Sequence, residues 1–461
     1  MKYKEYKGIN YADIAREVLQ RWQDGKVFER SVEGREGAPS FTFYEGPPSA
    51  NGTPGIHHVM ARAVKDIFCR YKTLKGYQVK RKGGWDTHGL PVELQVEKEL
   101  GITKEDIGKK ISVEEYNKRC KEAVMKYKDQ WDDLTEKMGY WVDLQNPYIT
   151  FDRNYMETLW WLLKQLYDKG LLYEGFTIQP YSPKAGTGLS SHELNQPGAY
   201  REVKDTTVVA QFKLADKDDE FFLAWTTTPW TLAANTALAV NPAIDYIKVA
   251  TYNPYTYQPV KVIFAKDRLN YLLNTKAEGI PLSDYKPGDK LIPYEILEEY
   301  KGKELVGIRY EQLLPYVPPT GDAFRVIEGD FVTTDEGTGI VHIAPTFGAD
   351  DFRAAKKAGI GAILVKDEEG KDSPIVDKQG RYVKEMGEFA GMYVKNEYYP
   401  AGEAPEKSLD VLLAIKLKEA NRAFKVEKYE HSYPHCWRTD KPVLYYPLDS
   451  WFIKTTAFKD R

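Results

Sequence analysis

The chain opens with alternating helical and extended hydrophobic patterns. Apolar residues recur every three or four positions over 11–30, which predicts a helix. The segment FTFYEGPPSANG (41–52) predicts a short strand and a turn, and the apolar stripe from Met60 to Leu74 predicts a second helix. A further strand follows in YQVKRKGGWD. A strand, a tight loop, a helix and a strand in this order form a βαβ unit, the building block of nucleotide-binding parallel sheets.

The pattern then changes. Residues 92–170 are charged and helical, and they end in an amphipathic helix that stops at Gly170. Between 205 and 366 short β-rich runs alternate with turn residues, as in a barrel or a mixed β domain. These runs are TTVVAQFKL, EFFLAWTT, YIKVATY, PVKVIFA, DFVTT, GIVHIAP and AILVK. Surface loops are predicted at 315–321 and 367–381. The pattern indicates a β-rich domain inserted into an α/β domain.

Composition narrows the class of protein. A chain of 461 residues is too long for one core, so we expect two or three domains. The net charge of −3 excludes a generally basic nucleic-acid coat, and no apolar run approaches the length of a membrane span. Three distant cysteines (Cys69, Cys120 and Cys436) cannot form a disulfide framework, which indicates a reducing compartment.

The first candidate site is NGTPGIHH (51–58), where a strand meets the start of a helix. Backbone N–H groups and the helix dipole favour an anion there, and imidazoles can donate to phosphate oxygens. A capped turn with two solvated histidines explains the same spacing. Seven basic residues and one acidic residue follow within 65–82. They form either a solvated face or a guide for polyanions.

Three further segments carry candidate chemistry. Asp86, in GGWDTHGLP, follows a strand end, where its carboxylate could hold an ammonium group or cap the next helix. WTTTPWT (225–231) presents four hydroxyls and two indoles, as a polar site or as an ordinary ST-turn. His342 lies nine residues before Asp351, which could belong to the same site or simply be a helix N-cap.

Five motifs in order carry a family resemblance. They are FYEGPPSANGTPGIHH, KGGWDTHGLPVE, WTTTPWTLAANTALAV, DEGTGIVHIAPTFGADD and SYPHCWR with SWFIK. Together they resemble the isoleucyl-tRNA synthetases, in particular the eukaryote-like branch that also occurs in some bacteria. The resemblance extends over essentially the whole chain, although valyl- and leucyl-tRNA synthetases share the scheme.

The resemblance implies a fold and a domain order. It implies an α/β Rossmann-type catalytic domain with a parallel sheet, interrupted by a β-rich, barrel-like editing domain called CP1. The implied boundaries are a helical extension over 1–40, the first part of the catalytic domain with a helical arm over 41–199, CP1 over 200–427, and a return into the catalytic domain over 428–461.

The resemblance also implies an activity. The family activates isoleucine with ATP, bound as its magnesium complex, transfers it to tRNA(Ile), and hydrolyses mischarged Val-tRNA(Ile) in the insertion. The implied partners are isoleucine, ATP and tRNA(Ile), with no membrane, and we expect a cytoplasmic monomer. A valyl- or leucyl-type synthetase is one alternative, and a non-catalytic tRNA- or nucleotide-binding module is another.

Residues of the activation site follow from the same match. Gly55, His57 and His58 occupy the place of the family's HIGH motif, with glycine at its first position and histidine at its third. His58 keeps the place of a phosphate donor. Gly46 and Pro47 match positions that line the isoleucine site. Asp86 matches the carboxylate that holds the α-ammonium group, a charge-assisted contact.

The editing residues match in the insertion. Thr226, Thr227, Thr228 and Asn235 match the threonine-rich editing peptide, and His342 and Asp351 match residues around the misattached amino acid. A carboxylate can hold the ammonium group while hydroxyls orient the ester and a water, so no covalent nucleophile is needed.

The family's second signature, KMSKS, does not occur in the 461 residues. Its lysines stabilise the pyrophosphate end of ATP. We therefore expect an N-terminal fragment that does not activate isoleucine.

The zinc site of the family's first-type branch has no equivalent set of thiolates. That branch has two C-x-x-C pairs, which would form a tetrahedral zinc site. Here the pairs read SPKA (182–185) and CWRT (436–439), which leaves one thiolate. His431 and His435 lie nearby, but Pro434 between them disfavours a regular helical face.

We therefore predict that the chain binds no structural zinc, and that hydrogen bonds and aromatic packing by Tyr181, Tyr433 and Trp437 join these segments instead. Metal analysis of the purified chain checks this prediction. Stoichiometric zinc that is lost together with folding on chelation would contradict it.

Overall fold

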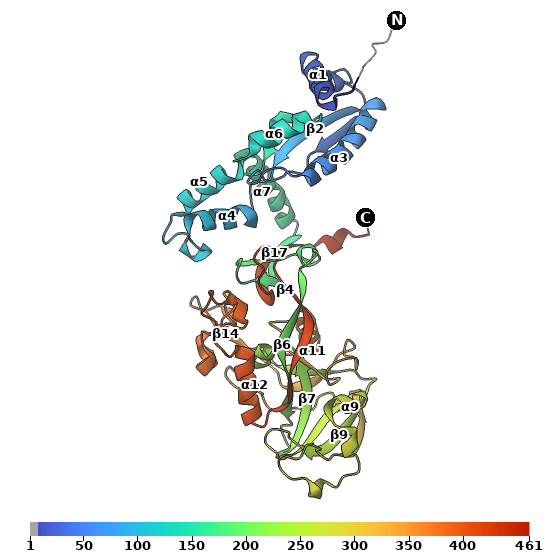
Figure 1. Cartoon of the computed structure of the whole chain (residues 1–461), viewed down its shortest axis with the longest axis vertical. Coiled ribbons are helices and arrows are strands. Elements are labelled where there is room, and N and C mark those ends of the chain that lie inside the picture. Colours follow the sequence, from blue (N-terminus) through green and yellow to red (C-terminus); the bar gives the residue numbers. More distant parts are fainter. Residues whose placement is uncertain (1–7, 461) are drawn as a thin grey trace. The chain divides into compact units, whose positions relative to one another are not determined.

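The computed structural model describes residues 8–460 and divides into two compact units (Figure 1). The first unit comprises Met1–Tyr173 with Ile453–Arg461, and the second is the continuous segment Glu174–Phe452. The second unit is therefore inserted into the first along the chain. The domain boundaries implied by the resemblance, at 200 and 427, remain predictions.

The first unit contains a three-stranded parallel sheet in the order β1-β2-β3. Its strands are β1 (Ser40–Tyr44), β2 (Gln78–Trp85) and β3 (Asp143–Ile149), and α3 (Ile56–Leu74) connects β1 to β2. This confirms the predicted βαβ unit. The other helices are α1 (Tyr11–Asp24), α2 (Val27–Glu33), α4 (Leu90–Leu100), α5 (Val113–Val124), α6 (Lys128–Lys137) and α7 (Arg153–Asp168).

Two predictions in this unit need correction. The helix expected over 11–30 is two helices, because Lys26 adopts a left-handed conformation with φ of 45° and interrupts the hydrogen-bond ladder. The stretch 92–170 is not helical throughout, because β3 lies inside it and pairs with β2. The polar character of β3 gave no alternating signal.

Helix α3 directs its apolar stripe away from the sheet. Met60, Ile67 and Phe68 are exposed, whereas Arg62 and Cys69 are buried. The buried side of the helix is held by ion pairs and hydrogen bonds rather than by aliphatic packing. The predicted helix is confirmed, but its apolar stripe does not form the core.

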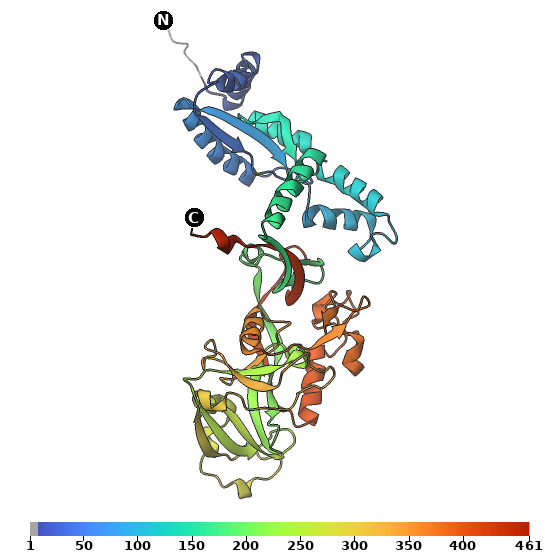
Figure 2. The ribbon, with the colours of Figure 1, turned by 180° about the vertical axis from the view of Figure 1, so that it is seen from behind.

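The second unit is built on a nine-stranded mixed sheet (Figure 1, Figure 2). Strands follow the order β11-β9-β10-β7-β13-β8-β12, and β6 joins through β7 and pairs with β16. Their bounds are β6 (Tyr200–Lys213), β7 (Glu220–Thr226), β8 (Ala237–Val240), β9 (Asp245–Tyr252), β10 (Pro259–Ala265), β11 (Glu295–Lys301), β12 (Arg325–Glu328), β13 (Val341–Ile343) and β16 (Ala423–Pro434). One unit with a parallel sheet and a second, β-rich unit inserted into it along the chain confirm the predicted fold class.

Smaller elements complete the second unit. The threonine-rich segment runs into η2 (Pro229–Ala234), and two helices flank the sheet, α11 (Ala349–Ala358) and α12 (Leu409–Glu419). A hairpin pairs β14 (Leu364–Lys366) with β15 (Asp372–Pro374), and a small sheet joins β17 (Leu444–Ile453), β4 (Leu172–Ser182) and β5 (Thr187–Gly188).

Most predicted strands of this unit are present, with two corrections. DFVTT (330–334) is a turn, because the Asn241 side-chain amide donates to the carbonyls of Asp330 and Val332, where a strand ladder would need them. The loop predicted over 367–381 contains β15, which pairs with β14.

Gly339, two residues before β13, lies where a side chain has no room. Gly339 has a φ of +73°, and a Cβ atom there would lie 2.2 Å from the Cβ of Ala265. Gly370, in the β14–β15 turn, has a φ of +79° but open space around it.

We predict that Gly370→Ala costs about 1–2 kcal/mol of unfolding free energy through backbone strain alone. Gly339→Ala should cost about 1–3 kcal/mol more, because the methyl group also overpacks the contact with Ala265. Denaturant unfolding of both variants measures the difference. Equal losses would contradict the close approach at Gly339.

Candidate functional site

The carboxyl ends of β1 and β2 bring three predicted residues together in the first unit. Parallel strands direct the residues that follow them to one edge of the sheet, the usual ligand position in α/β folds. The Asp86 backbone N–H donates to the Pro48 carbonyl at 3.0 Å. This hydrogen bond places the loop that contains Gly46 and Pro47 beside Asp86.

Asp86 does not cap the next helix. The N-cap of α4 is Gly89, and the Asp86 carboxylate accepts the N–H of His88 at 3.3 Å. Immediately after the neighbouring strand β3, Thr150 contacts both the Thr87 hydroxyl at 2.8 Å and the His88 ring at 3.0 Å. The half-buried Asp86 carboxylate is therefore held in a local turn at the edge where a ligand would bind.

His58 is oriented as a neutral hydrogen-bond donor. Gly55 is the N-cap of α3, and its N–H donates to Nδ1 of His58 at 2.9 Å. Burial, followed by the neighbouring His57 and Arg62, lowers the pKa of His58. With Nδ1 accepting, the proton of the neutral ring is assigned to Nε2. His57 is exposed, with its ring centroid 3.7 Å from that of His58.

Three of the seven cations in the basic run over 65–82 form ion pairs with carboxylates of the first unit. Lys65 pairs with the buried Glu45 at 2.5 Å, and Arg70 and Arg81 both pair with Asp66. These three cations therefore have partners within the unit, and the choice between a solvated face and a guide for polyanions stays a prediction for the rest of the run. Glu45 lies within the first of the five motifs, but the sequence gave no reason to assign it a role.

A cavity of about 620 Å³ lies elsewhere in the first unit. It is lined by α1, α2 and the sheet, including Trp22, Phe28 and Tyr140. None of the predicted site residues lines this cavity.

The second unit brings the threonine-rich turn next to β13. Strands β7 and β13 are parallel, with Trp225 opposite Val341, so both chains continue from the same edge. Thr226 forms an ST-turn, because its hydroxyl oxygen accepts the N–H of Thr228 at 3.1 Å. The ST-turn that the sequence offered as one explanation of WTTTPWT is therefore present. It also fixes the positions of the threonine hydroxyls.

The hydroxyls of the turn differ in their bonding. The Thr231 hydroxyl donates to the Thr228 carbonyl at 2.8 Å. The Thr228 hydroxyl lies 3.4 Å from that of Thr226 and 3.2 Å from that of Thr231. Thr227 is half-buried, and its hydroxyl makes no hydrogen bond with any residue of 8–460. Thr227 therefore keeps its full hydrogen-bonding capacity for a ligand.

His342 joins this turn from β13. Its Nε2 lies 3.2 Å from the Thr231 oxygen, whose own proton is used on Thr228, so the neutral ring is assigned as the Nε2–H tautomer. Burial lowers the pKa of His342 to about 4. Its Nδ1 is buried and has no hydrogen-bond partner among the described residues. A neutral acceptor is therefore left unpaired beside the threonines.

Asp351 is not the N-cap of α11. Gly348 holds that position, and Asp351 Oδ2 reaches back to accept the N–H of Ala344, two residues after His342, at 2.9 Å. Burial raises the pKa of Asp351 to about 6. A Cβ atom on Gly348 would lie 2.7 Å from the carboxyl carbon of Asp351, so glycine makes room for this carboxylate.

Asn235, unlike Thr227, uses its polar atoms in hydrogen bonds within the unit. Its amide donates to the Ala237 carbonyl at 2.8 Å and accepts the Tyr310 hydroxyl at 2.7 Å. Its polar atoms are thus used within the unit, where they connect the end of η2 to β8.

Two residues that hold the threonine-rich turn gave no sequence signal. Asp410 accepts the Trp230 N–H at 2.9 Å, and Tyr382 donates its hydroxyl to the Trp230 carbonyl. Both lie far along the chain from the turn. Asp410 is in the first turn of α12, where acidic residues are common, so the sequence gives it no special role. Only the tertiary structure reveals these contacts.

The residues at the positions of the zinc cysteines form hydrogen bonds and apolar contacts within the chain. Ser182 accepts the Ala185 N–H at 3.2 Å, and Cys436 is buried among Leu189, Leu194 and Val443. Trp437 donates to Glu193 at 3.3 Å. Over residues 8–460, no group of three or more potential metal ligands is found.

Comparison with known proteins now decides the family. The family model of class I tRNA synthetases (I, L, M and V) matches residues 17–461. The chain belongs to this family. It is 66% identical over its whole length to the isoleucine–tRNA ligase of Cytophaga hutchinsonii and 60% identical to that of Bacteroides fragilis. It spans 43% and 42% of the lengths of these relatives.

Two more distant matches complete the comparison. The isoleucine–tRNA ligase of Clostridium tetani is 42% identical and is covered over 40% of its length. Among solved structures, the CP1 region of a leucyl-tRNA synthetase (GlLeuRS) aligns over 49% of this chain and 100% of its own, with 16% identity and a TM-score of 0.32. None of the helices over residues 8–460 combines the length and hydropathy needed to cross a bilayer.

The raised pKa of Asp351 makes a prediction about stability. Because its folded-state pKa of about 6 exceeds the ordinary value of 3.8, the folded chain binds the proton more tightly than the unfolded chain. Stability is therefore lost as pH rises from about 4 to about 6. Asp351→Asn removes this loss, so the variant should gain about 1–3 kcal/mol relative to wild type across that window.

Unfolding free energies measured from pH 4 to pH 7 check this prediction. The exposed neighbour Asp350, changed to asparagine, provides the control, and its difference from wild type should vary little over the same window. A pH-independent difference for Asp351→Asn would show that its carboxylate is not desolvated.

Proposed function

We propose that this chain belongs to an enzyme that joins isoleucine to tRNA(Ile) and that its second unit hydrolyses mischarged Val-tRNA(Ile). The 461 residues themselves contain no KMSKS lysines, so we do not expect them to activate isoleucine. Family membership and the isoleucine–tRNA ligases among its relatives support this proposal. The observation that carries it is the convergence of a threonine-rich turn, a neutral histidine and a desolvated carboxylate at the β7–β13 edge.

A second, hydrolytic site is needed because a single binding site discriminates poorly between isoleucine and valine. Isoleucine and valine differ by one methylene, which gives about 10- to 200-fold discrimination in a binding site, a known magnitude for isoleucyl-tRNA synthetases themselves. Hydrolysis of the wrong product supplies the remaining accuracy. Such a site must hold an aminoacyl ester and admit a water.

The residues at the β7–β13 edge suit ester hydrolysis by water. Asp351 is largely ionised at neutral pH and incompletely paired, so it can hold the α-ammonium group of the misattached valine. His342 stays neutral, and its Nδ1 can accept a proton in a hydrogen bond from substrate or water. Thr227 and Thr228 can orient the ester. Water then attacks the ester carbonyl carbon, the acyl–oxygen bond to ribose breaks, and the ribose oxygen takes up a proton.

The first unit suits the binding of isoleucine and ATP. The Asp86 carboxylate, beside Gly46 and Pro47, can hold the ammonium group of isoleucine. The Nε2–H of His58 can donate to an ATP phosphate oxygen at the start of α3, with ATP bound as its magnesium complex. In this proposal the substrates are isoleucine, ATP and tRNA(Ile). A monomeric state and a cytoplasmic location remain predictions from the sequence.

We predict that the chain hydrolyses Val-tRNA(Ile) and leaves Ile-tRNA(Ile) intact. Asp351→Ala should lower the rate about 100-fold, because the ammonium group loses a charged partner. Asp350→Ala, at the exposed neighbouring position, should retain the activity. Single-turnover deacylation with radiolabelled valine measures all three proteins.

The same assay separates the alternatives. A non-catalytic binding module would leave Val-tRNA(Ile) intact in every case. Hydrolysis of Thr-tRNA(Val) in place of Val-tRNA(Ile) would indicate a valyl-type enzyme. Full activity in Asp351→Ala would remove Asp351 from the proposed site.

A further inference from the structure

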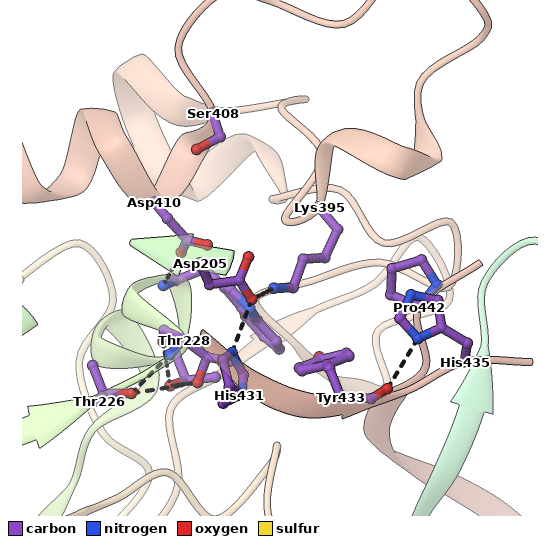
Figure 3. A network of polar contacts seen from close by, with 12 residues as sticks. Asp205, Thr226, Thr228, Lys395, Ser408, Asp410, His431, Tyr433, His435 and Pro442 are labelled. Atoms are coloured by element: carbon purple, nitrogen blue, oxygen red, sulfur yellow. Dashed lines mark hydrogen bonds and ion pairs between the residues drawn. The ribbon is translucent and has the colours of Figure 1, made fainter. Parts of the chain in front are cut away.

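A buried network of charged groups lies beside the threonine-rich turn (Figure 3). Lys395 pairs with Asp205 at 2.6 Å, and the His431 ring contacts the same carboxylate oxygen at 3.3 Å. The Lys395 ammonium also lies 4.5 Å from the centroid of the Tyr433 ring. Asp410 enters the network from the first turn of α12.

The charges in this network are desolvated. Only 5% of the Lys395 side chain is exposed, and Asp410 as a whole is 5% exposed. Burial opposes the charge on Lys395, yet Tyr433, Asp410 and Asp205 raise its pKa. Burial also opposes the charge on Asp205, but hydrogen bonds from His431 and Lys395 bring its pKa down to about 2. The Lys395–Asp205 ion pair is therefore retained at neutral pH.

Asp410, unlike Asp205, bonds to a backbone N–H and to no cationic side chain among the described residues. Its one hydrogen bond with the described residues is the 2.9 Å contact with the Trp230 N–H. Burial raises the pKa of Asp410 to about 7, against the opposing effects of Lys395 and of the Trp230 hydrogen bond. An amide oxygen could accept this N–H without the cost of burying a charge. A carboxylate differs from that amide by its charge, which strengthens the hydrogen bond to the Trp230 N–H.

The group that Asp410 holds is central to the hydrolytic site. Trp230 lies between Thr228 and Thr231, and Thr231 contacts His342. With its N–H held by Asp410 and its carbonyl held by Tyr382, the Trp230 backbone is fixed from both sides. A small rotation of this peptide would move the hydroxyls on either side of it.

We propose that Asp410 is a positioning residue for hydrolysis, which fixes the threonine-rich turn through the Trp230 N–H while Lys395 supplies the compensating positive charge. This inference rests on the proposed editing function. Asp410 touches neither the ester nor the water. Its effect on the rate is transmitted through the placement of Thr227, Thr228 and Thr231.

The test compares Asp410→Asn with Ser408→Ala in the complete chain. Ser408 caps the same helix by accepting the N–H of Val411, and it does not contact Trp230. Asp410→Asn should lower the single-turnover rate on Val-tRNA(Ile) about 10- to 100-fold at pH 8, the kinetic equivalent of losing one charge-assisted hydrogen bond. The affinity for tRNA should not change. Ser408→Ala should lower the thermal midpoint and leave the rate unchanged.

The pH profile gives a readout that a purely structural role would not move. The charged groups that act on Asp410 are Lys395, Asp205 and Lys428. As pH falls through about 7, wild-type Asp410 takes up a proton and comes to resemble asparagine. The ratio of wild-type to Asp410→Asn rates should therefore be constant above about pH 8 and fall towards one below about pH 6. The ratio cancels pH effects that both proteins share.

Lys395 is tested by a matched pair of variants. Lys395→Arg keeps the positive charge and should retain most of the activity. Lys395→Met removes the charge and should reduce the rate in the same direction as Asp410→Asn. Thermal midpoints of both variants show whether the fold is intact.

The outcomes distinguish the two proposals. Wild-type chain that does not hydrolyse Val-tRNA(Ile) would overturn the proposed function, and this inference with it. Active wild type with an Asp410→Asn rate equal to that of Ser408→Ala, or with a rate ratio independent of pH, would overturn the positioning role alone. Hydrogen exchange at the Trp230 amide should be faster in Asp410→Asn than in wild type, and unchanged protection there would also overturn it.

Discussion

The proposed hydrolytic site depends on one short parallel contact, the pairing of Trp225 in β7 with Val341 in β13. This contact directs the threonine-rich turn and the loop after β13 to the same edge of the sheet. On its other side β13 pairs with β8, where His342 lies opposite Leu238. The strands here are almost completely buried, so a shift in register would move apolar side chains out of the core. The placement of the polar site is thus fixed by apolar packing.

Three aspartates of the second unit, of which Asp410 is buried and Asp205 and Asp351 are half-buried, differ in pKa because their partners differ. Asp205 has cationic partners, and its pKa falls to about 2. Asp351 and Asp410 each have a backbone N–H as a partner, and burial raises the pKa of each, to about 6 and about 7. A carboxylate that lacks a full counter-charge gains most from a cation that binds beside it. Asp351 is therefore suited to an ammonium group, while Asp205 is already satisfied.

The first unit combines a polar interface with an apolar exterior. Helix α3 contacts β2 through Asp66 and Thr73, which both bind Arg81, and contacts α6 through Arg62, whereas its large apolar side chains are exposed. This reverses the usual orientation of an amphipathic helix. Exposed apolar faces of this kind generally mark surfaces that contact another surface. The candidate ligand residues lie at the carboxyl edge of the sheet, where the βαβ topology places them.

The sequence by itself determined the local elements and the family, because periodicity, turn residues and five ordered motifs are local signals. It predicted the βαβ unit, most strands of the inserted unit and the residues of both candidate sites. It could not determine the direction of the α3 stripe or the turn at 330–334, since each depends on distant partners. It also left open whether Asp86 and Asp351 cap helices, and the tertiary structure shows Gly89 and Gly348 in those positions. The contact of Asp410 with Trp230 was beyond prediction, because a hydrogen bond between segments 180 residues apart leaves no pattern in either one.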